Sequence, residues 1–172
     1  PNLTGREAEY LQECIESTFV SSVGPFVTKF EEVVAEFSGS KFCVATSAGT
    51  TGLHVALEAI GVSRNDLVIL PSFTFIASAN AIAYCGASPW LFDVSEASWT
   101  LDPAMLARHL ASETQQKGEK LIHKATGKKV AAIMPVYTLG MPANMDEIIK
   151  IAKDYNLPVI ADGAAALGAT YK

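Results

Sequence analysis

The sequence Leu157-Pro-Val-Ile-Ala-Asp162-Gly-Ala-Ala-Ala-Leu-Gly-Ala169 joins an apolar, strand-like run to a single acidic residue at its end. Ligands of open α/β sheets bind beside the carboxyl ends of the strands, so Asp162 is the first residue to which we assign a chemical role. The alternative is structural, because Asp is also a favoured cap for the backbone after Gly163. The rest of the sequence is needed to choose between these two interpretations.

Strand-like and helix-like patterns alternate along most of the chain. The predicted strands are 42–46, 67–71, 89–93, 130–136 and 157–162. The predicted helices are 50–60, 76–84, one opened by Asp102 and Pro103, and one from Asn144 to about residue 155. Parallel strands need crossover helices, so this alternation predicts an α/β three-layer sandwich with a mostly parallel sheet.

Two other parts of the chain have a different pattern. Amphipathic helices on either side of a loop at 20–24 predict an N-terminal helical arm, residues 1–40, before the α/β domain at 41–172. A polar stretch at 114–129 predicts a small hairpin in which 121–124 and 128–130 flank an Ala-Thr-Gly turn.

Composition excludes several classes of protein. The net charge of -5 argues against a nucleic-acid surface, which needs a dense field of Lys and Arg. The three cysteines and three histidines form no cluster with zinc-type spacing, so we expect no metal and a reducing compartment, the cytoplasm. We expect no membrane span, because no apolar run is long enough, and no signal peptide, because charged residues follow Pro1 closely.

A small-residue turn, Thr46-Ser-Ala-Gly-Thr-Thr51, follows the first predicted strand and opens a helix. Free amides and the positive helix dipole at this point favour a phosphate, with Gly49 allowing close approach and Thr50 adding a hydroxyl. The turn is neither a Walker loop nor a dinucleotide-binding turn. The alternative is an ordinary capped turn, since Ser and Thr are common caps.

Aromatic residues follow the second predicted strand in Pro71-Ser-Phe-Thr-Phe-Ile-Ala-Ser78. Phe75 is the candidate to stack on a flat ring, and the alternative is that it belongs to the local core. Tyr137, after the fourth strand, either lines a substrate cleft or packs under Met141. The lysines of the polar stretch either steer a diphosphate or belong to a solvated hairpin. His54 is expected to face solvent or a subunit partner.

Taken together, these segments resemble the fold type I pyridoxal-phosphate enzymes, and within them the DegT/DnrJ/EryC1/StrS sugar aminotransferases, over the whole chain. The order and spacing of many short motifs carry this resemblance. They are Asn2-Leu-Thr-Gly5, Val20-Ser-Ser-Val-Gly-Pro-Phe-Val27, Phe30-Glu31, Ala48-Gly-Thr50, Leu70-Pro-Ser-Phe-Thr-Phe75, Ala79-Asn-Ala-Ile82, Pro135-Val136, Gly140, Asp162 and Leu167-Gly-Ala169.

The resemblance implies pyridoxal phosphate as the cofactor and a role for each candidate residue. Asp162 would keep the pyridine nitrogen protonated, Phe75 would stack on the ring, and Gly49 and Thr50 would bind the phosphate. It also implies transamination of a nucleotide-linked 4-keto sugar with glutamate as amino donor, in a homodimer with shared active sites. Residues 41–172 would then be part of the large, cofactor-binding domain.

The sequence departs from the family pattern at four points. Ala165 replaces a usual Gln or Glu, and Gly163 replaces a usual Ala. The Schiff-base lysine lies beyond this segment in the family, and Lys172 resembles a different, earlier lysine. A late strand that would neighbour 42–46 is missing as well.

We therefore expect an N-terminal fragment, incomplete at the C-terminus, that is inactive alone. The alternatives are a pyridoxamine-phosphate-dependent sugar dehydratase with His at the lysine position, or an inert binding or assembly module.

Overall fold

The structure is a computed structural model that describes residues 2–172. The chain divides into two compact units, Pro1–Ala45 and Thr46–Lys172. The assignment of residues 1–40 to a helical arm and of 41–172 to part of a cofactor-binding domain remains a proposal.

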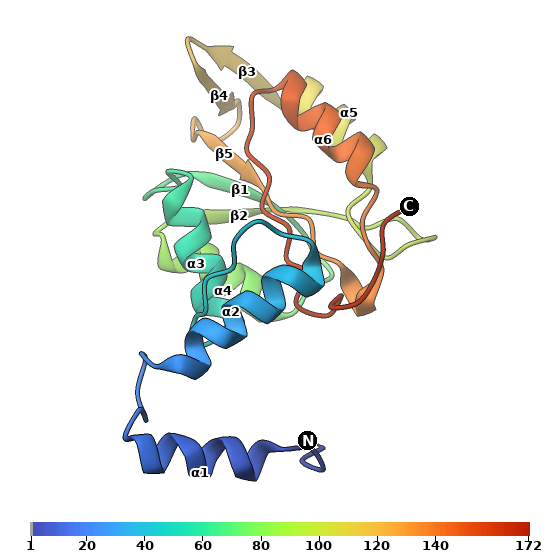
Figure 1. Ribbon diagram of the computed structural model, residues 1–172. Coiled ribbons are helices and arrows are strands. Elements are labelled where there is room, and N and C mark those ends of the chain that lie inside the picture. The colour runs from blue at the N-terminus through green and yellow to red at the C-terminus, as the bar shows by residue number, and fades with distance from the viewer. Residues whose placement is uncertain (1) are drawn as a thin grey trace. The chain divides into compact units, whose positions relative to one another are not determined.

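A three-stranded parallel sheet forms the centre of the second unit (Figure 1). It contains β1 (Leu67–Pro71), β2 (Ser88–Phe92) and β5 (Val130–Ile133) in the order β2-β1-β5. All five residues of the central strand β1 are buried. Such a continuous apolar run is typical of a parallel strand that is covered on both faces.

Helices cover both faces of this sheet. On one face, α3 (Gly49–Ala59) and α4 (Ile76–Tyr84) pack on a core that includes Val68 and Leu70. On the other face, α5 (Pro103–Glu113) and α6 (Met145–Asp154) pack on a core that includes Ile69. The alternation of inward-facing side chains along β1 thus supplies both cores. The predicted three-layer α/β sandwich is confirmed.

Residues 157–162 lie along the outer edge of β5. They pair with it in parallel through isolated bridges, Ile133 with Val159 and Val136 with Asp162. The Asp162 amide donates to the Pro135 carbonyl, and the Tyr137 amide donates to the Asp162 carbonyl, each at 2.9 Å. The predicted last strand is therefore an extended edge segment, and it places Asp162 beyond the carboxyl end of β5.

The prediction of a buried strand at 42–46 is wrong. Phe42 and Val44 are each 77% exposed, and no strand among residues 2–172 pairs with this segment. The Ala45 amide instead donates to the Glu31 carboxylate at 2.8 Å. A strand is stabilised by ladder hydrogen bonds and cross-strand contacts, so without a neighbour this apolar run stays irregular.

The polar stretch forms a hairpin, but between different segments from those expected. β3 (Thr114–Lys117) pairs antiparallel with β4 (Lys120–His123), and the connection contains Gly118 at φ 59°. A glycine with positive φ at the first position of a two-residue loop suits a tight hairpin. The pairing expected across the Ala-Thr-Gly turn is reduced to one bridge, Ile122 with Lys129.

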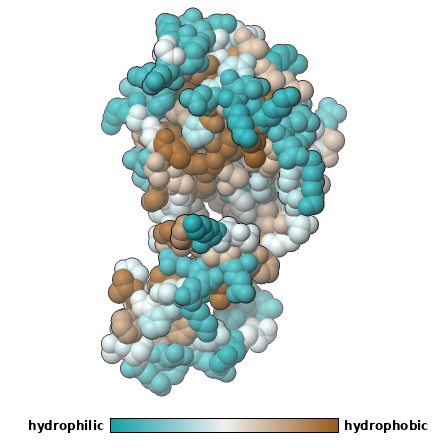
Figure 2. All heavy atoms as spheres, turned by 45° about the horizontal axis from the view of Figure 1, so that its top comes forward, coloured by the Kyte–Doolittle hydropathy of each residue, from teal (hydrophilic) through white to brown (hydrophobic). Residues whose placement is uncertain are grey.

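The first unit contains two helices, α1 (Glu7–Ser17) and α2 (Pro25–Ser38), and neither has a buried residue. The rings of Tyr10 and Phe26 lie 5.1 Å apart and join the helices. Large apolar side chains remain exposed on both helices, and apolar residues are visible on the molecular surface in Figure 2. They include Leu11, Ile15, Phe30, Val33 and Phe37.

Within residues 2–172, every helix is too short or too polar to span a lipid bilayer.

Asp102 begins α5 in the way that the sequence predicts. Its carboxylate accepts hydrogen bonds from the amides of Ala104 and Met105, at 2.8 and 3.2 Å. We expect Asp102→Ala to lower the free energy of unfolding by about 1 kcal/mol, measured by denaturant titration. Asp102→Asn keeps an acceptor and should lose less. Equal losses in the two variants would contradict this explanation.

Candidate active site

A cavity of about 450 Å³ opens at the carboxyl edge of the sheet, between the segments that follow β1 and β5. From β1 the chain crosses to β2 on one side, whereas β5 lies on the other side of β1. This reversal of direction is a topological switch point, where ligands of open α/β sheets bind. The N-terminus of α3 and residues 162–165 complete the wall.

All four residues that the sequence singled out line this cavity: Gly49, Thr50, Phe75 and Asp162. They come from three separate segments, namely the first turn of α3, the loop before α4 and the edge segment beside β5. The fold therefore brings together the groups that were expected to meet. Their individual roles toward a ligand remain proposals.

The Asp162 carboxylate is held on both oxygens. Its Oδ1 accepts from the Ala164 amide at 3.2 Å, which is the capping interaction considered as the alternative. Its Oδ2 accepts from the Ser78 hydroxyl at 2.7 Å. The side chain is buried, with Asp162 9% exposed. Capping thus uses one oxygen of Asp162. The other oxygen is bonded to Ser78, which the sequence patterns did not indicate.

The N-terminus of α3 lies at the cavity, where Gly49 and Thr50 line the wall. Its N-cap residue, Ala48, makes no side-chain cap bond. Thr51 closes the turn, because its hydroxyl accepts from the Ala48 amide and donates to the Ala48 carbonyl. A methyl group built on Gly49 would meet nothing within 4 Å. Part of the turn is therefore the expected ordinary cap, while Gly49 and Thr50 line open space where the helix dipole favours an anion.

Phe75 projects into this region and is 80% exposed. The alternative that it belongs to the local core is therefore wrong. Nearby Phe73 packs edge-on against Trp99, with ring centroids 5.3 Å apart. Phe75 is left as an exposed flat ring at the cavity.

Tyr137 also lines the cavity, which supports the first of its two expected placements. Burial, with a smaller contribution from Tyr171, raises the pKa of the Tyr137 phenol above its usual value. Its hydroxyl therefore stays protonated at neutral pH and can donate a hydrogen bond. Ala165 lines the wall as well, and its methyl group offers no such donor.

Lys172 does not line this cavity. Its ammonium pairs with the Asp146 carboxylate, and this hydrogen bond and charge raise the pKa of Lys172. A lysine held protonated is a poor nucleophile. We leave Lys172 out of the proposed catalytic residues.

Two lysines of the polar stretch lie at the opposite edge of the sheet. Lys128 Nζ donates to the Ser88 hydroxyl at 3.2 Å, and Lys129 Nζ lies 3.1 Å from Asp66 Oδ2. Ser88 begins β2 and Asp66 precedes β1, so these contacts mark the amino ends of the strands. None of the five hairpin lysines lines the cavity, and the steering interpretation finds no support.

One group of side chains that can ligate metals was missed by the sequence analysis. Ligand atoms of His54, Glu58 and Cys85 lie within 4.8 Å of one another, on α3 and at the end of α4. Burial, and then the Glu58 carboxylate, raise the pKa of the Cys85 thiol. A metal at this group would have to displace the proton of the thiol, because it binds the thiolate. We assign none, and His54 lies outside the cavity wall.

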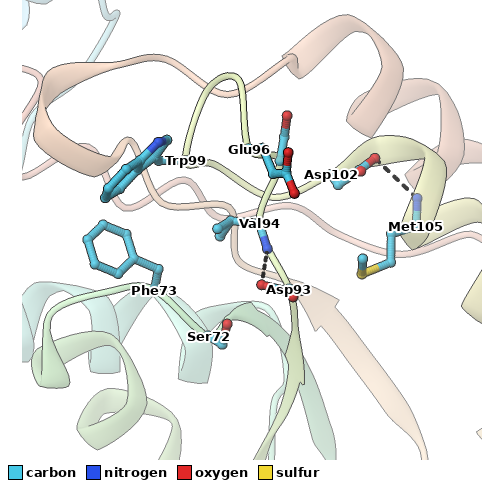
Figure 3. Close-up of a pocket in the computed structure, with 9 residues that line it drawn as sticks. Ser72, Phe73, Asp93, Val94, Glu96, Trp99, Asp102 and Met105 are labelled. Carbon is cyan, nitrogen blue, oxygen red and sulfur yellow. Dashed lines mark hydrogen bonds between the residues drawn. The ribbon is translucent and has the colours of Figure 1, made fainter.

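A second, larger cavity of about 800 Å³ lies beyond the ends of β1 and β2 (Figure 3). Three carboxylates line it, those of Asp93, Glu96 and Asp102. Such a lining repels phosphate groups. The smaller cavity, which contains the convergent candidate residues, is therefore the candidate active site.

The chain matches the DegT/DnrJ/EryC1/StrS aminotransferase family over residues 1–172. It is 42% identical over 172 residues to GDP-perosamine synthase of Caulobacter vibrioides, a match that covers 100% of this chain and 42% of that protein. The chain thus spans about two fifths of the length of this relative.

Solved structures agree with this assignment. The aminotransferase from Psychrobacter cryohalolentis superposes with a TM-score of 0.83 at 34% identity, covering 99% of this chain and 40% of that one. NtdA from Bacillus subtilis with bound cofactor PMP gives a TM-score of 0.76 at 28% identity, covering 93% of this chain and 34% of that one. The fold is therefore that of fold type I pyridoxal-phosphate enzymes. From its sequence and its structure, the chain belongs to the DegT/DnrJ/EryC1/StrS family of pyridoxal-phosphate-dependent aminotransferases.

Proposed function

We propose that this chain forms part of the cofactor site of an aminotransferase that acts on a nucleotide-linked 4-keto sugar. The observation that carries the proposal is the convergence of Gly49, Thr50, Phe75 and Asp162 on one cavity at the switch point of the sheet. The Caulobacter relative is named GDP-perosamine synthase, after a GDP-linked sugar, and this name supports the substrate class.

The residues present fit pyridoxal phosphate. The cavity volume of about 450 Å³ lies in the usual range for small-molecule sites. The open turn at Gly49 and Thr50 suits the phosphate, and the exposed ring of Phe75 suits a flat heterocycle. The buried carboxylate of Asp162 suits a protonated ring nitrogen. When bound, the cofactor supplies an electron sink for the substrate carbon.

Each residue then has a distinct task. Asp162 holds a proton at the pyridine nitrogen, Gly49 and Thr50 fix the phosphate end, and Phe75 restricts the tilt of the ring. The protonated hydroxyl of Tyr137 offers a further donor at the same wall. The methyl of Ala165 leaves the ring oxygen without the partner that a Gln or Glu supplies at this position. The Schiff-base lysine is not among these residues.

Three further parts of the proposal concern the whole enzyme. The amino donor is glutamate, the location is the cytoplasm and the assembly is a homodimer. The free cysteines Cys14, Cys43 and Cys85 support a reducing compartment. The exposed apolar residues of α1 and α2 support burial against further protein. Sedimentation analysis of the full-length gene product tests the homodimer.

The test of the function uses the full-length gene product. Purified with pyridoxal phosphate, it should show a visible absorbance band of bound cofactor that bleaches on addition of glutamate. A nucleotide-linked keto sugar should restore the band and yield an amino sugar, identified by mass spectrometry. A protein that binds no cofactor under these conditions would refute the proposal.

Phe75 provides a test that separates ligand binding from folding. Because Phe75 is 80% exposed, we expect Phe75→Ala to leave the free energy of unfolding of the cofactor-free protein nearly unchanged. Lost stacking should weaken cofactor binding about tenfold, measured by fluorescence titration. Phe75→Leu, which keeps an apolar side chain without a ring, is the matched control. Retained affinity in both variants would show that Phe75 does not stack.

A further inference from the structure

Ser78 is a fully buried serine in the first turn of α4, with 0% exposure. Its hydroxyl donates to Asp162 Oδ2 at 2.7 Å, across 84 positions of sequence. Most helix-borne serines turn their hydroxyls to solvent or to backbone carbonyls of the preceding turn. Ser78 bonds instead to the carboxylate that ends the edge segment beside β5.

A second hydroxyl stands behind Ser78. Thr74 Oγ1 lies 2.9 Å from Ser78 Oγ, and either oxygen is geometrically able to donate. A hydroxyl carries one proton, and an ionised carboxylate only accepts, so the Ser78 proton is committed to Asp162. Thr74 is therefore the donor to Ser78, in preference to its longer contact of 3.3 Å with the Phe75 carbonyl. The bonds run in one direction, from Thr74 through Ser78 to Asp162.

These bonds fix the orientation of the Asp162 carboxylate. Ser78 holds Oδ2, and the Ala164 amide holds Oδ1 at 3.2 Å, so rotation of the group would break both bonds. Each oxygen retains a further lone pair for an additional partner in the cavity.

We propose that Ser78, supported by Thr74, is a positioning residue that orients the Asp162 carboxylate toward the cofactor nitrogen. This inference rests on the proposed function, because it assigns the ring nitrogen as the partner of Asp162. Ser78 itself does not line the cavity and acts through Asp162. Thr74 lines the cavity and connects the buried pair to its wall.

The experiment measures the protonation of the ring nitrogen directly. The full-length gene product is loaded with cofactor labelled with ¹⁵N in the ring, and the nitrogen chemical shift is followed as pH rises. In the native protein the nitrogen should stay protonated at neutral pH. Ser78→Ala should lower the pH at which the proton is lost by about one unit or more, because the Asp162 carboxylate is no longer held facing the nitrogen and their ion pair weakens.

Thr74→Val should shift the titration in the same direction by a smaller amount, and Thr74→Ser should restore it. If Ser78→Ala fails to fold, the nitrogen titration of Thr74→Val tests the positioning role instead. The matched control is Ser72→Ala. It removes a hydroxyl from the loop that also contains Thr74, and this hydroxyl does not contact Asp162.

The outcomes separate the inference from the proposed function. If the native protein holds a protonated nitrogen, and Ser78→Ala and Thr74→Val leave its titration unchanged, the positioning role is wrong and the function stands. A variant that only unfolds more easily, with an unchanged nitrogen titration, would reduce Ser78 to a structural role. If the native protein binds no cofactor, the proposed function fails and the inference fails with it.

Discussion

Replacing Asp162 with Asn should lower kcat for transamination by the full-length gene product by about a hundredfold to a thousandfold. That range is typical when one preorganised electrostatic group is removed from an active site. The amide has no negative charge to keep a proton on the pyridine nitrogen, so the electron sink is weakened while the shape of the side chain is kept. Steady-state kinetics and the spectrum of the bound cofactor measure the loss.

The same substitution has a structural consequence. The Asp162 carboxylate accepts from Ser78 on one oxygen and from the Ala164 amide on the other. An Asn side chain offers one acceptor oxygen, so one of these two donors loses its partner. An unpaired buried donor costs about 1–3 kcal/mol, which denaturant titration of the cofactor-free protein should detect.

Asp66 provides the matched control for a buried acid. It is 7% exposed, accepts from the Ser63 amide at 3.0 Å and pairs with Lys129 at 3.1 Å, at the amino edge of the sheet. Asp66→Asn should therefore lower stability without changing kcat at a temperature where the protein stays folded. If Asp66→Asn and Asp162→Asn lowered kcat equally, the role assigned to Asp162 would be wrong.

Leu70→Ala should produce the largest loss of stability. Leu70 lies on the central strand β1, is 0% exposed and packs in the core beneath α3 and α4. Truncation removes apolar contacts and leaves a cavity in a layer that the sheet and two helices hold in place. The expected loss in the free energy of unfolding is about 2–5 kcal/mol, measured by denaturant titration of the full-length gene product.

Leu91 is the control for this substitution, because it is the register partner of Leu70 on the neighbouring strand β2. Leu91 is 57% exposed, so Leu91→Ala should change stability by less than about 0.5 kcal/mol. The two variants remove the same atoms from adjacent strands. Similar losses would show that Leu91 is buried in the native assembly, or that the layer order is wrong.

The elements with strong local signals were predicted closely. The strand at 67–71 and the helix at 76–84 have the bounds that their apolar patterns predict. Asp102 and Pro103 open α5 as the cap and the first residue. These features depend on contacts within a few residues, which sequence patterns record directly.

Elements that depend on a distant partner were predicted less well. The apolar run 42–46 was assigned to a buried strand, yet no strand within residues 2–172 pairs with it. Residues 157–162 pair with β5 only through bridges, and the hairpin pairs 114–117 with 120–123, whereas 121–124 and 128–130 were expected to pair. A run of apolar residues shows that a segment can enter a sheet, whereas pairing requires a neighbour at the right place.

The same division applies to the active site. Sequence patterns alone indicated the layer order, the edge of the sheet where a ligand binds, and the candidate residues Gly49, Thr50, Phe75 and Asp162. Only the tertiary structure joined Ser78 to Asp162, paired Lys172 with Asp146 and left Phe75 exposed. Periodicity reports which face of an element is apolar, but a hydrogen bond between side chains 84 positions apart forms only when packing brings two elements together.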